Sequence, residues 1–65
     1  MFEVEILTNK NERLIIVSDK AVIREGCIQL IDVKEVNGED VHQKTSTLFY
    51  PLRNIQFFTL IDGEG

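Results

Sequence analysis

The dipeptide Asn37-Gly38, which closes the longest β-like run in the chain, constrains the fold more than any other feature of the sequence. The run is Gly26 to Val36, GCIQLIDVKEV. Asn and Gly both tolerate positive φ angles, which a two-residue type I′ turn requires at both central positions. The sequence therefore predicts a long strand that ends in a tight hairpin turn. Because such a turn would place Glu35 opposite Asp40, an unfavourable like-charge pair, a looser register is a second option.

The apolar pattern of this run changes side part-way along. Ile28 and Leu30 share one face of a strand, whereas Ile31 and Val33 share the other. Side chains alternate with a period of two, so a flat strand with one buried face cannot give this pattern. It predicts a bulge near Ile31-Asp32 or a bent strand whose two ends cover different sheets. Small barrels use long bent strands of this kind to turn a corner.

The rest of the chain also has strand-like patterning. A polar break is expected at Ser18 to Lys20, and residues 39–47 are predicted to be either an exposed hairpin arm or a mobile loop. A helix over Pro51 to Ile61 is a weaker alternative, because the stiff and bulky side chains of that segment favour a strand. The remaining strands are predicted at Met1 to Thr8, Arg13 to Val17, Ala21 to Arg24, Leu48 to Tyr50 and Ile55 to Ile61.

These segments predict an all-β protein. Five or six short strands with turn signals roughly every 8–12 residues are typical of a small barrel or sandwich. We expect a five- to six-stranded antiparallel barrel with a long bent central strand. In a chain of 65 residues it would form one domain over residues 1–61, followed by a flexible tail at 62–65.

Composition and charge exclude several classes of function. Hydrophobic residues make up 43% of the chain and the net charge is −4, with the seven basic residues dispersed. Nucleic-acid affinity comes mainly from clustered Lys and Arg, so nucleic-acid binding is not expected. No apolar run approaches the roughly 20 residues that span a membrane. Residues 1–20 carry no secretory-signal pattern, and a lone cysteine fits a reducing interior, so a cytoplasmic protein is expected.

The residues that carry chemistry are few. Cys27 and His42 are the only nucleophile–base pair, and Glu3 and Glu5 are two carboxylates on one strand face. Each has a more common explanation: a small packed cysteine, a solvated histidine and a wet strand face. No metal-ligand spacing and no Gly-rich phosphate loop is present. We therefore expect no enzyme activity, no catalytic, cofactor or metal site, and no small-molecule substrate.

Aromatic and aliphatic residues near the C-terminus are the best candidates for a binding surface. In the predicted strand Ile55 to Ile61, Ile55, Phe57 and Ile61 would share one side, and Phe58 and Leu60 the other. A small domain can cover only one of these sides with its own chain, and an uncovered apolar patch usually marks an interface. Pro51 suits only a strand edge, end or bend, where another chain can add. The expected interface residues are Tyr50, Phe57, Phe58 and Leu60.

The segment Leu48 to Phe58, LFYPLRNIQFF, resembles the second signature of Sm-like proteins. In that signature an apolar strand leads through a short turn to Asn and an aliphatic residue, which Asn54 and Ile55 would match. The resemblance implies that the expected barrel is SH3-like or Sm-like, strongly bent and five-stranded, and that it assembles into rings through edge strands. It does not extend to the RNA-binding residues, because Pro51-Leu52 stands where Sm-like proteins have Arg-Gly, and their first signature is absent.

The sequence thus favours a small intracellular, non-enzymatic binding module that acts through self-association or contact with a protein partner. The first alternative is an Sm-like RNA-binding ring protein. The second is an accessory subunit of an enzyme, which would need residues from a partner chain.

Overall fold

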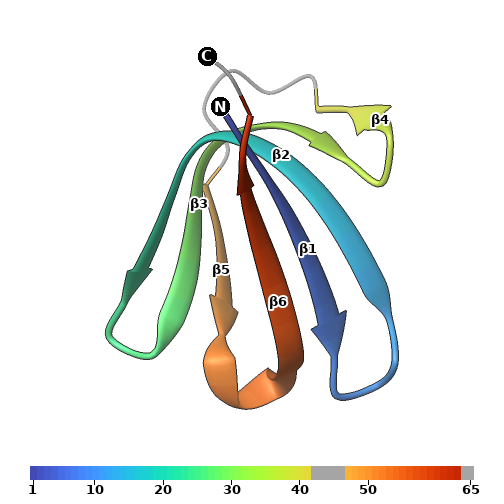
Figure 1. Ribbon diagram of the computed structural model, residues 1–65, viewed down its shortest axis with the longest axis vertical. Helices are drawn as coiled ribbons and strands as arrows, with labels where there is room; N and C mark the ends of the chain where they lie inside the picture. Colours follow the sequence, from blue (N-terminus) through green and yellow to red (C-terminus); the bar gives the residue numbers. More distant parts are fainter. Residues whose placement is uncertain (42–46, 64–65) are drawn as a thin grey trace.

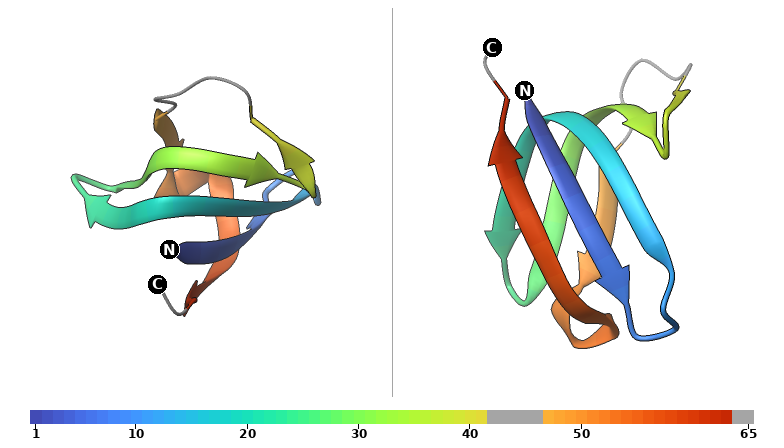
Figure 2. Two further views of the ribbon diagram at one scale, coloured as in Figure 1. Left: turned by 90° about the horizontal axis from the view of Figure 1, so that it is seen from above. Right: turned by 45° about the vertical axis from the view of Figure 1, so that its right-hand side comes forward.

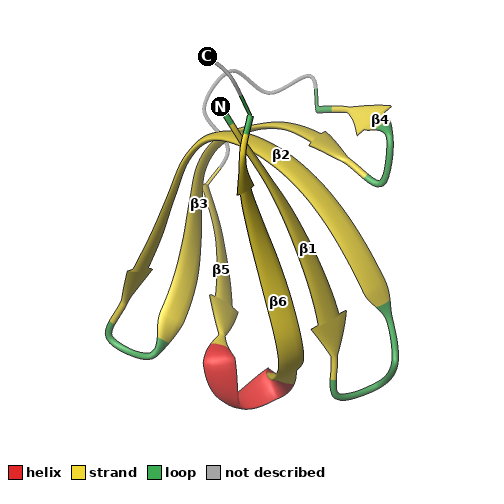
Figure 3. Ribbon diagram, in the orientation of Figure 1, coloured by secondary structure: helices red, strands yellow, loops and turns green. Residues whose placement is uncertain are grey.

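The computed structural model describes residues 1–41 and 47–63, and most of them lie in β-strands (Figure 1). The all-β prediction is confirmed. The helical alternative for Pro51 to Ile61 is wrong except for one 3₁₀ turn, η1 (Leu52–Asn54), the only helical element in the described ranges (Figure 3). The strands are β1 (Phe2–Thr8), β2 (Arg13–Arg24), β3 (Cys27–Val36), β4 (Glu39–Asp40), β5 (Thr47–Pro51) and β6 (Ile55–Asp62).

The strands form one antiparallel sheet in the order β4-β3-β2-β1-β6, and β5 also pairs with β3. Residues 27–31 of β3 pair with β5, and Glu35 and Val36 pair with the short β4. Among the described strands, β5 pairs only with β3 and β6 only with β1. The sheet is strongly curved, but the predicted closure into a barrel is wrong, because the edges β5 and β6 are joined by η1 and do not pair with each other (Figure 2).

Strands β2 and β3 bend together, and the bend folds the sheet over itself (Figure 1). The expected break at Ser18 to Lys20 is instead a bend within one continuous 12-residue strand. Ser18 is fully buried there, and its hydroxyl donates a hydrogen bond to the carbonyl oxygen of Lys20 at 3.0 Å. On β3, Asp32 has a φ of 56°, and the β2–β3 register shifts between Val17 and Ser18. The predicted irregularity in the long strand is confirmed.

The bend brings two half-sheets face to face around one core. Strand β1 and the first half of β2 contribute Val4, Ile6 and Ile16. Strand β3 contributes residues from both sides of its bend: Ile28, Leu30 and Val33. All six are at most 2% exposed, and their burial supplies the main driving force for folding. Because the inner faces of the two half-sheets meet in this cluster, their outer faces point away from each other.

Two hairpin turns depend on residues with positive φ. Asn37 and Gly38 have φ angles of 53° and 84°, and Glu35 pairs with Asp40, so the tight turn and its strict register are both present. The looser register is not adopted, despite the like charges. Glu25 and Gly26, with φ angles of 53° and 73°, form an equivalent turn between β2 and β3. Both pairs fit the type I′ geometry, which matches the twist of the strands it connects.

Candidate interaction surface

Strand β6 begins with a bulge that separates two apolar side chains. Thr8 pairs with Ile55 and Leu7 pairs with Phe57, which leaves Gln56 as an extra residue. The Gln56 side chain donates hydrogen bonds to the Thr8 carbonyl oxygen at 3.0 Å and to Asn11 Oδ1 at 2.7 Å. Simple alternation placed Ile55 on the same side as Phe57. Because of the bulge, Ile55 instead packs against the core while Phe57 is 52% exposed.

The four expected interface residues fall into two groups. Tyr50 pairs with Ile28 and Phe58 pairs with Ile6, and both aromatic side chains pack against the core cluster. Phe57 is exposed on the outer side of β6. Leu60 lies in the inner row with Val4, yet it is 44% exposed because the open sheet leaves this end of β6 uncovered.

The outer face of the first half-sheet combines apolar residues with carboxylates. Residues that are directly opposite in an antiparallel pair share a face, so the face follows from the register. We call it the acidic face. It is defined as the outward residues of β6, of β1, of the first half of β2, of the second half of β3, and of β4. These are Phe57, Thr59 and Ile61; Glu3, Glu5 and Leu7; Arg13, Ile15 and Val17; Glu35; and Asp40.

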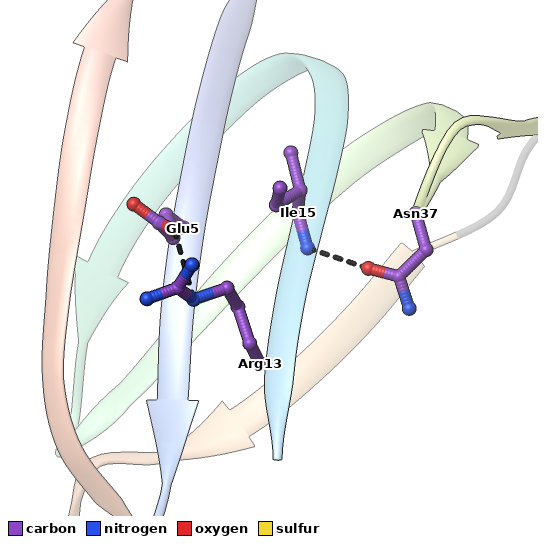
Figure 4. A network of polar contacts seen from close by, with 4 residues as sticks. All are labelled: Glu5, Arg13, Ile15 and Asn37. Carbon is purple, nitrogen blue, oxygen red and sulfur yellow. Dashed lines mark hydrogen bonds and ion pairs between the residues drawn. The ribbon is translucent and has the colours of Figure 1, made fainter. Parts of the chain in front are cut away.

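Only one ion pair lies on the acidic face in the described part of the chain. Arg13 Nε is 3.2 Å from Glu5 Oε2 (Figure 4). Glu3, Glu35 and Asp40 have no salt-bridge partner there and lie in one row across the strands, with Val17 between Glu3 and Glu35. The face therefore combines uncompensated negative charge with exposed Phe57, Ile61 and Ile15.

The outer face of the second half-sheet has the opposite charge. We call it the basic face, defined as the outward residues of β5, the first half of β3 and the second half of β2. These are Thr47, Phe49 and Pro51; Cys27, Gln29 and Ile31; and Lys20, Val22 and Arg24. None of these outward positions holds a carboxylate. Phe49 is 59% exposed and Val22 38% exposed, so this face is also partly apolar.

Two shallow grooves lie where η1 joins the edge strands. The first, of about 300 Å³, is lined by residues that include Tyr50, Ile55 and Asn54. Burial raises the pKa of the Tyr50 hydroxyl. At this groove the β1–β2 loop is held against η1 by Asn9, whose side chain donates to the Arg53 carbonyl oxygen at 2.8 Å. The second groove, of about 430 Å³, includes Cys27 and Arg53 in its lining.

Among the described residues, those considered for chemistry are not assembled into a catalytic arrangement. Cys27 is a free, half-buried thiol, and His42 lies outside the described residues. Glu3 and Glu5 do share the acidic face, where Glu5 is paired with Arg13. Within residues 1–41 and 47–63 no three His, Cys, Asp or Glu side chains are placed to hold a metal ion. Nor does any described helix have the length and hydrophobicity to cross a membrane.

Comparison with known proteins gives no relative. No family model matches the chain, and neither a curated protein nor a solved structure matches it significantly. The function is therefore inferred from the residues of this chain alone.

On the acidic and basic faces, the exposed apolar residues beyond those expected from the sequence are Ile15, Val22 and Phe49. The apolar character of both sides of Arg13 to Val17 was a signal for Ile15. Nothing local in the sequence distinguishes Phe49 from a core aromatic residue.

Proposed function

We propose that this protein is a small non-enzymatic binding module that associates with further copies of itself through β6. The observation that carries the proposal is the exposure of β6, whose Phe57 and Ile61 are 52% and 51% exposed on one side and Leu60 44% exposed on the other. Phe57 and Ile61 flank Thr59 on the outer side of β6, and exposed apolar side chains that gather in this way usually mark an interface.

The backbone of β6 supports the same proposal. It is an edge strand of eight residues and carries no charged residue before Asp62. Natural proteins usually protect an edge with charge, Pro or a very short strand. The edge strand β5 ends in Pro51, and β4 has only two residues, so each has one of these protections, whereas β6 has only the bulge at its start.

The finer fold in this proposal is an SH3-like or Sm-like arrangement of strands that is open between β5 and β6. It is supported by the matched bends of β2 and β3 and by the consecutive edge strands β5 and β6. The Sm-like RNA-binding alternative has less support. Asn54, which matches the Sm-like signature, accepts a hydrogen bond from the Asn9 main-chain N–H through its own carbonyl, and its nearest basic neighbour in sequence is Arg53.

The proposal is tested by the native mass of the protein across a dilution series, for the wild type, Phe57→Asp and Ile23→Asp. Ile23 is 54% exposed and lies on β2, so Ile23→Asp is a control for placing an acid at an equally exposed apolar position away from β6. We expect the wild type and the control to associate with rising concentration and Phe57→Asp to remain a monomer. A wild type that stays monomeric at high concentration refutes the proposal.

A second variant separates the interface from the core. Phe58 faces inward against Ile6, so Phe58→Ala should lower the free energy of unfolding by about 3 kcal/mol. Phe57→Ala should change the stability of the monomer by less than about 1 kcal/mol, because its side chain is already half in water. Equal losses would show that Phe57 is a core residue.

A further inference from the structure

We infer that the surface receiving the acidic face of one copy is the basic face of the next copy, so that the copies associate head to tail. The inference rests on the proposed self-association and names the second surface of that contact. Both surfaces belong to the same chain and lie on opposite sides of its core.

The two faces are complementary in charge. The acidic face presents Glu3, Glu35 and Asp40 without salt-bridge partners in the described residues. The basic face presents Lys20 and Arg24, which alternate with Val22 along β2. Complementary potentials favour one pairing of surfaces over others and speed the encounter of the two partners.

The nearest acidic side chain on β2 does not cancel the charge of the basic face. Asp19 Oδ2 is 3.6 Å from Lys34 Nζ, so this carboxylate already has a cation. Glu25 lies in the turn after Arg24 rather than at an outward strand position. Lys20 and Arg24 are both exposed and take part in no salt bridge among the described residues.

The faces also match in apolar content. On the acidic face, exposed Ile61 pairs with Glu3, and exposed Phe57 lies at the other end of β6, paired with Leu7. On the basic face, exposed Val22 lies between Lys20 and Arg24 along β2, and exposed Phe49 lies in the same row as Val22, across Gln29. Each surface therefore carries an exposed aromatic side chain, an exposed aliphatic side chain and charged residues, the mixture that forms the centre and rim of protein interfaces.

The alternative pairing between copies, with two acidic faces in contact, is disfavoured. It would bring two sets of unpaired carboxylates together, and like charges at an interface suppress association. When the acidic face of one copy binds the basic face of another, the dimer still has one free acidic face and one free basic face. Further copies can therefore add through the same contact, and the assembly is a ring if the rotation between copies closes or an open filament if it does not.

The test uses two charge-reversed variants of the full chain. The first is Glu3→Lys with Glu35→Lys on the acidic face, and the second is Lys20→Glu with Arg24→Glu on the basic face. Native mass is measured at low salt for the wild type, for each variant alone and for their equimolar mixture. A far-UV spectrum of each variant verifies that it is folded.

Each variant alone has two faces of the same sign, so its association should weaken by about tenfold or more. In the mixture, each variant meets a partner of opposite charge, so association should return. Recovery in the mixture supports the inference, because loss of folding or of general solubility would not be repaired by mixing.

Association of either variant as strong as that of the wild type, or a mixture that stays monomeric, overturns the inference. If, in addition, Phe57→Asp still abolishes wild-type association, the proposed role of β6 stands and only the receiving surface is wrong. A wild type that is monomeric throughout refutes both proposals.

Discussion

Asn37 and Ile15 are joined by two hydrogen bonds, and Figure 4 shows the one that uses the Asn37 side chain. The Asn37 N–H donates to the Ile15 carbonyl oxygen at 2.7 Å, and Asn37 Oδ1 accepts from the Ile15 N–H at 2.9 Å. Strand β3 ends at Val36, so this amide oxygen replaces the main-chain acceptor that a longer strand would have supplied. Asn37 therefore both forms the turn and extends the β2–β3 ladder by one position.

The double role of Asn37 gives a graded prediction. Asn37→Gly keeps the positive φ accessible but removes the acceptor for Ile15, and should cost about 1 kcal/mol. Asn37→Val also places a β-branched residue at φ 53°, and should cost about 2 kcal/mol or more. Urea denaturation of the three proteins gives the order. If Asn37→Gly is as stable as the wild type, the side-chain hydrogen bond contributes nothing.

Glu25 predicts a stabilising substitution. It adopts a φ of 53° in the β2–β3 turn, although a residue with a long side chain is disfavoured there. Glu25→Asn creates the Asn-Gly pair preferred in such turns and should raise the free energy of unfolding by about 0.5–1 kcal/mol. Gly26→Ala is the counterpart: no atom lies within 4 Å of an added Cβ, so a loss of stability would come from the backbone at φ 73° alone. A lower denaturation midpoint for Glu25→Asn would contradict the turn geometry.

Ser18 predicts a polar contribution to the bend. Ser18→Ala removes the hydroxyl that donates to the Lys20 carbonyl oxygen and should cost about 1 kcal/mol. In a domain of this size that corresponds to a fall in melting temperature of roughly 4–8 °C. Ser18→Thr, which keeps the hydroxyl, serves as the comparison for small changes in packing. A melting temperature for Ser18→Ala equal to that of the wild type would show that the bend does not need this hydrogen bond.

Tyr50 predicts a loss of stability in alkaline solution. Burial raises the pKa of its hydroxyl above the ordinary value of 10.0 because the charged form is poorly solvated. The unfolded chain therefore releases this proton at lower pH than the folded chain. The contribution of the Tyr50 hydroxyl to the free energy of unfolding is fully present below the pKa of the unfolded chain. It is lost as the pH rises through the pKa of the folded chain.

Tyr50 is the only tyrosine in the chain, so tyrosinate absorbance during an alkaline titration reports on this hydroxyl alone. The midpoint should lie above that of the unfolded chain. The stability of Tyr50→Phe should fall less steeply than that of the wild type in the same pH range. A midpoint equal to that of the unfolded chain would show that the hydroxyl is solvated.

Local sequence chemistry was sufficient to predict the strands and the Asn37-Gly38 turn, but not how the strands continue through irregular positions. Ser18 to Lys20 is polar and has the composition of a break. It remains a strand because β3 bends opposite it, at Asp32, and because Ser18 supplies a hydrogen bond to its own backbone. Such a match between two strands has no signal in either strand alone.

The candidate surface depended on the same kind of long-range information. The extra residue in β6 is Gln56, and its hydrogen bonds reach Thr8 and Asn11 near the other end of the chain. Alternation within β6 could not predict this bulge, so Ile55 was placed on the wrong side. The charge difference between the two outer faces depends on the complete strand register, and dispersed charges in the sequence gave no indication of it.

The pairing of β1 with both β2 and β6 has a consequence for the order of folding. Strands β1, β2 and β3 are joined by short turns, and their ladders bring together residues that are close in sequence. The β1–β6 ladder instead aligns Phe2 with Asp62, across almost the whole chain. Closing so large a loop is entropically slow, so β6 should join a preformed meander late. Until β6 has joined, Val4 and Ile6 lack one neighbouring strand. The core is therefore complete only after β6, the strand proposed to bind other copies, has paired with β1 of its own chain.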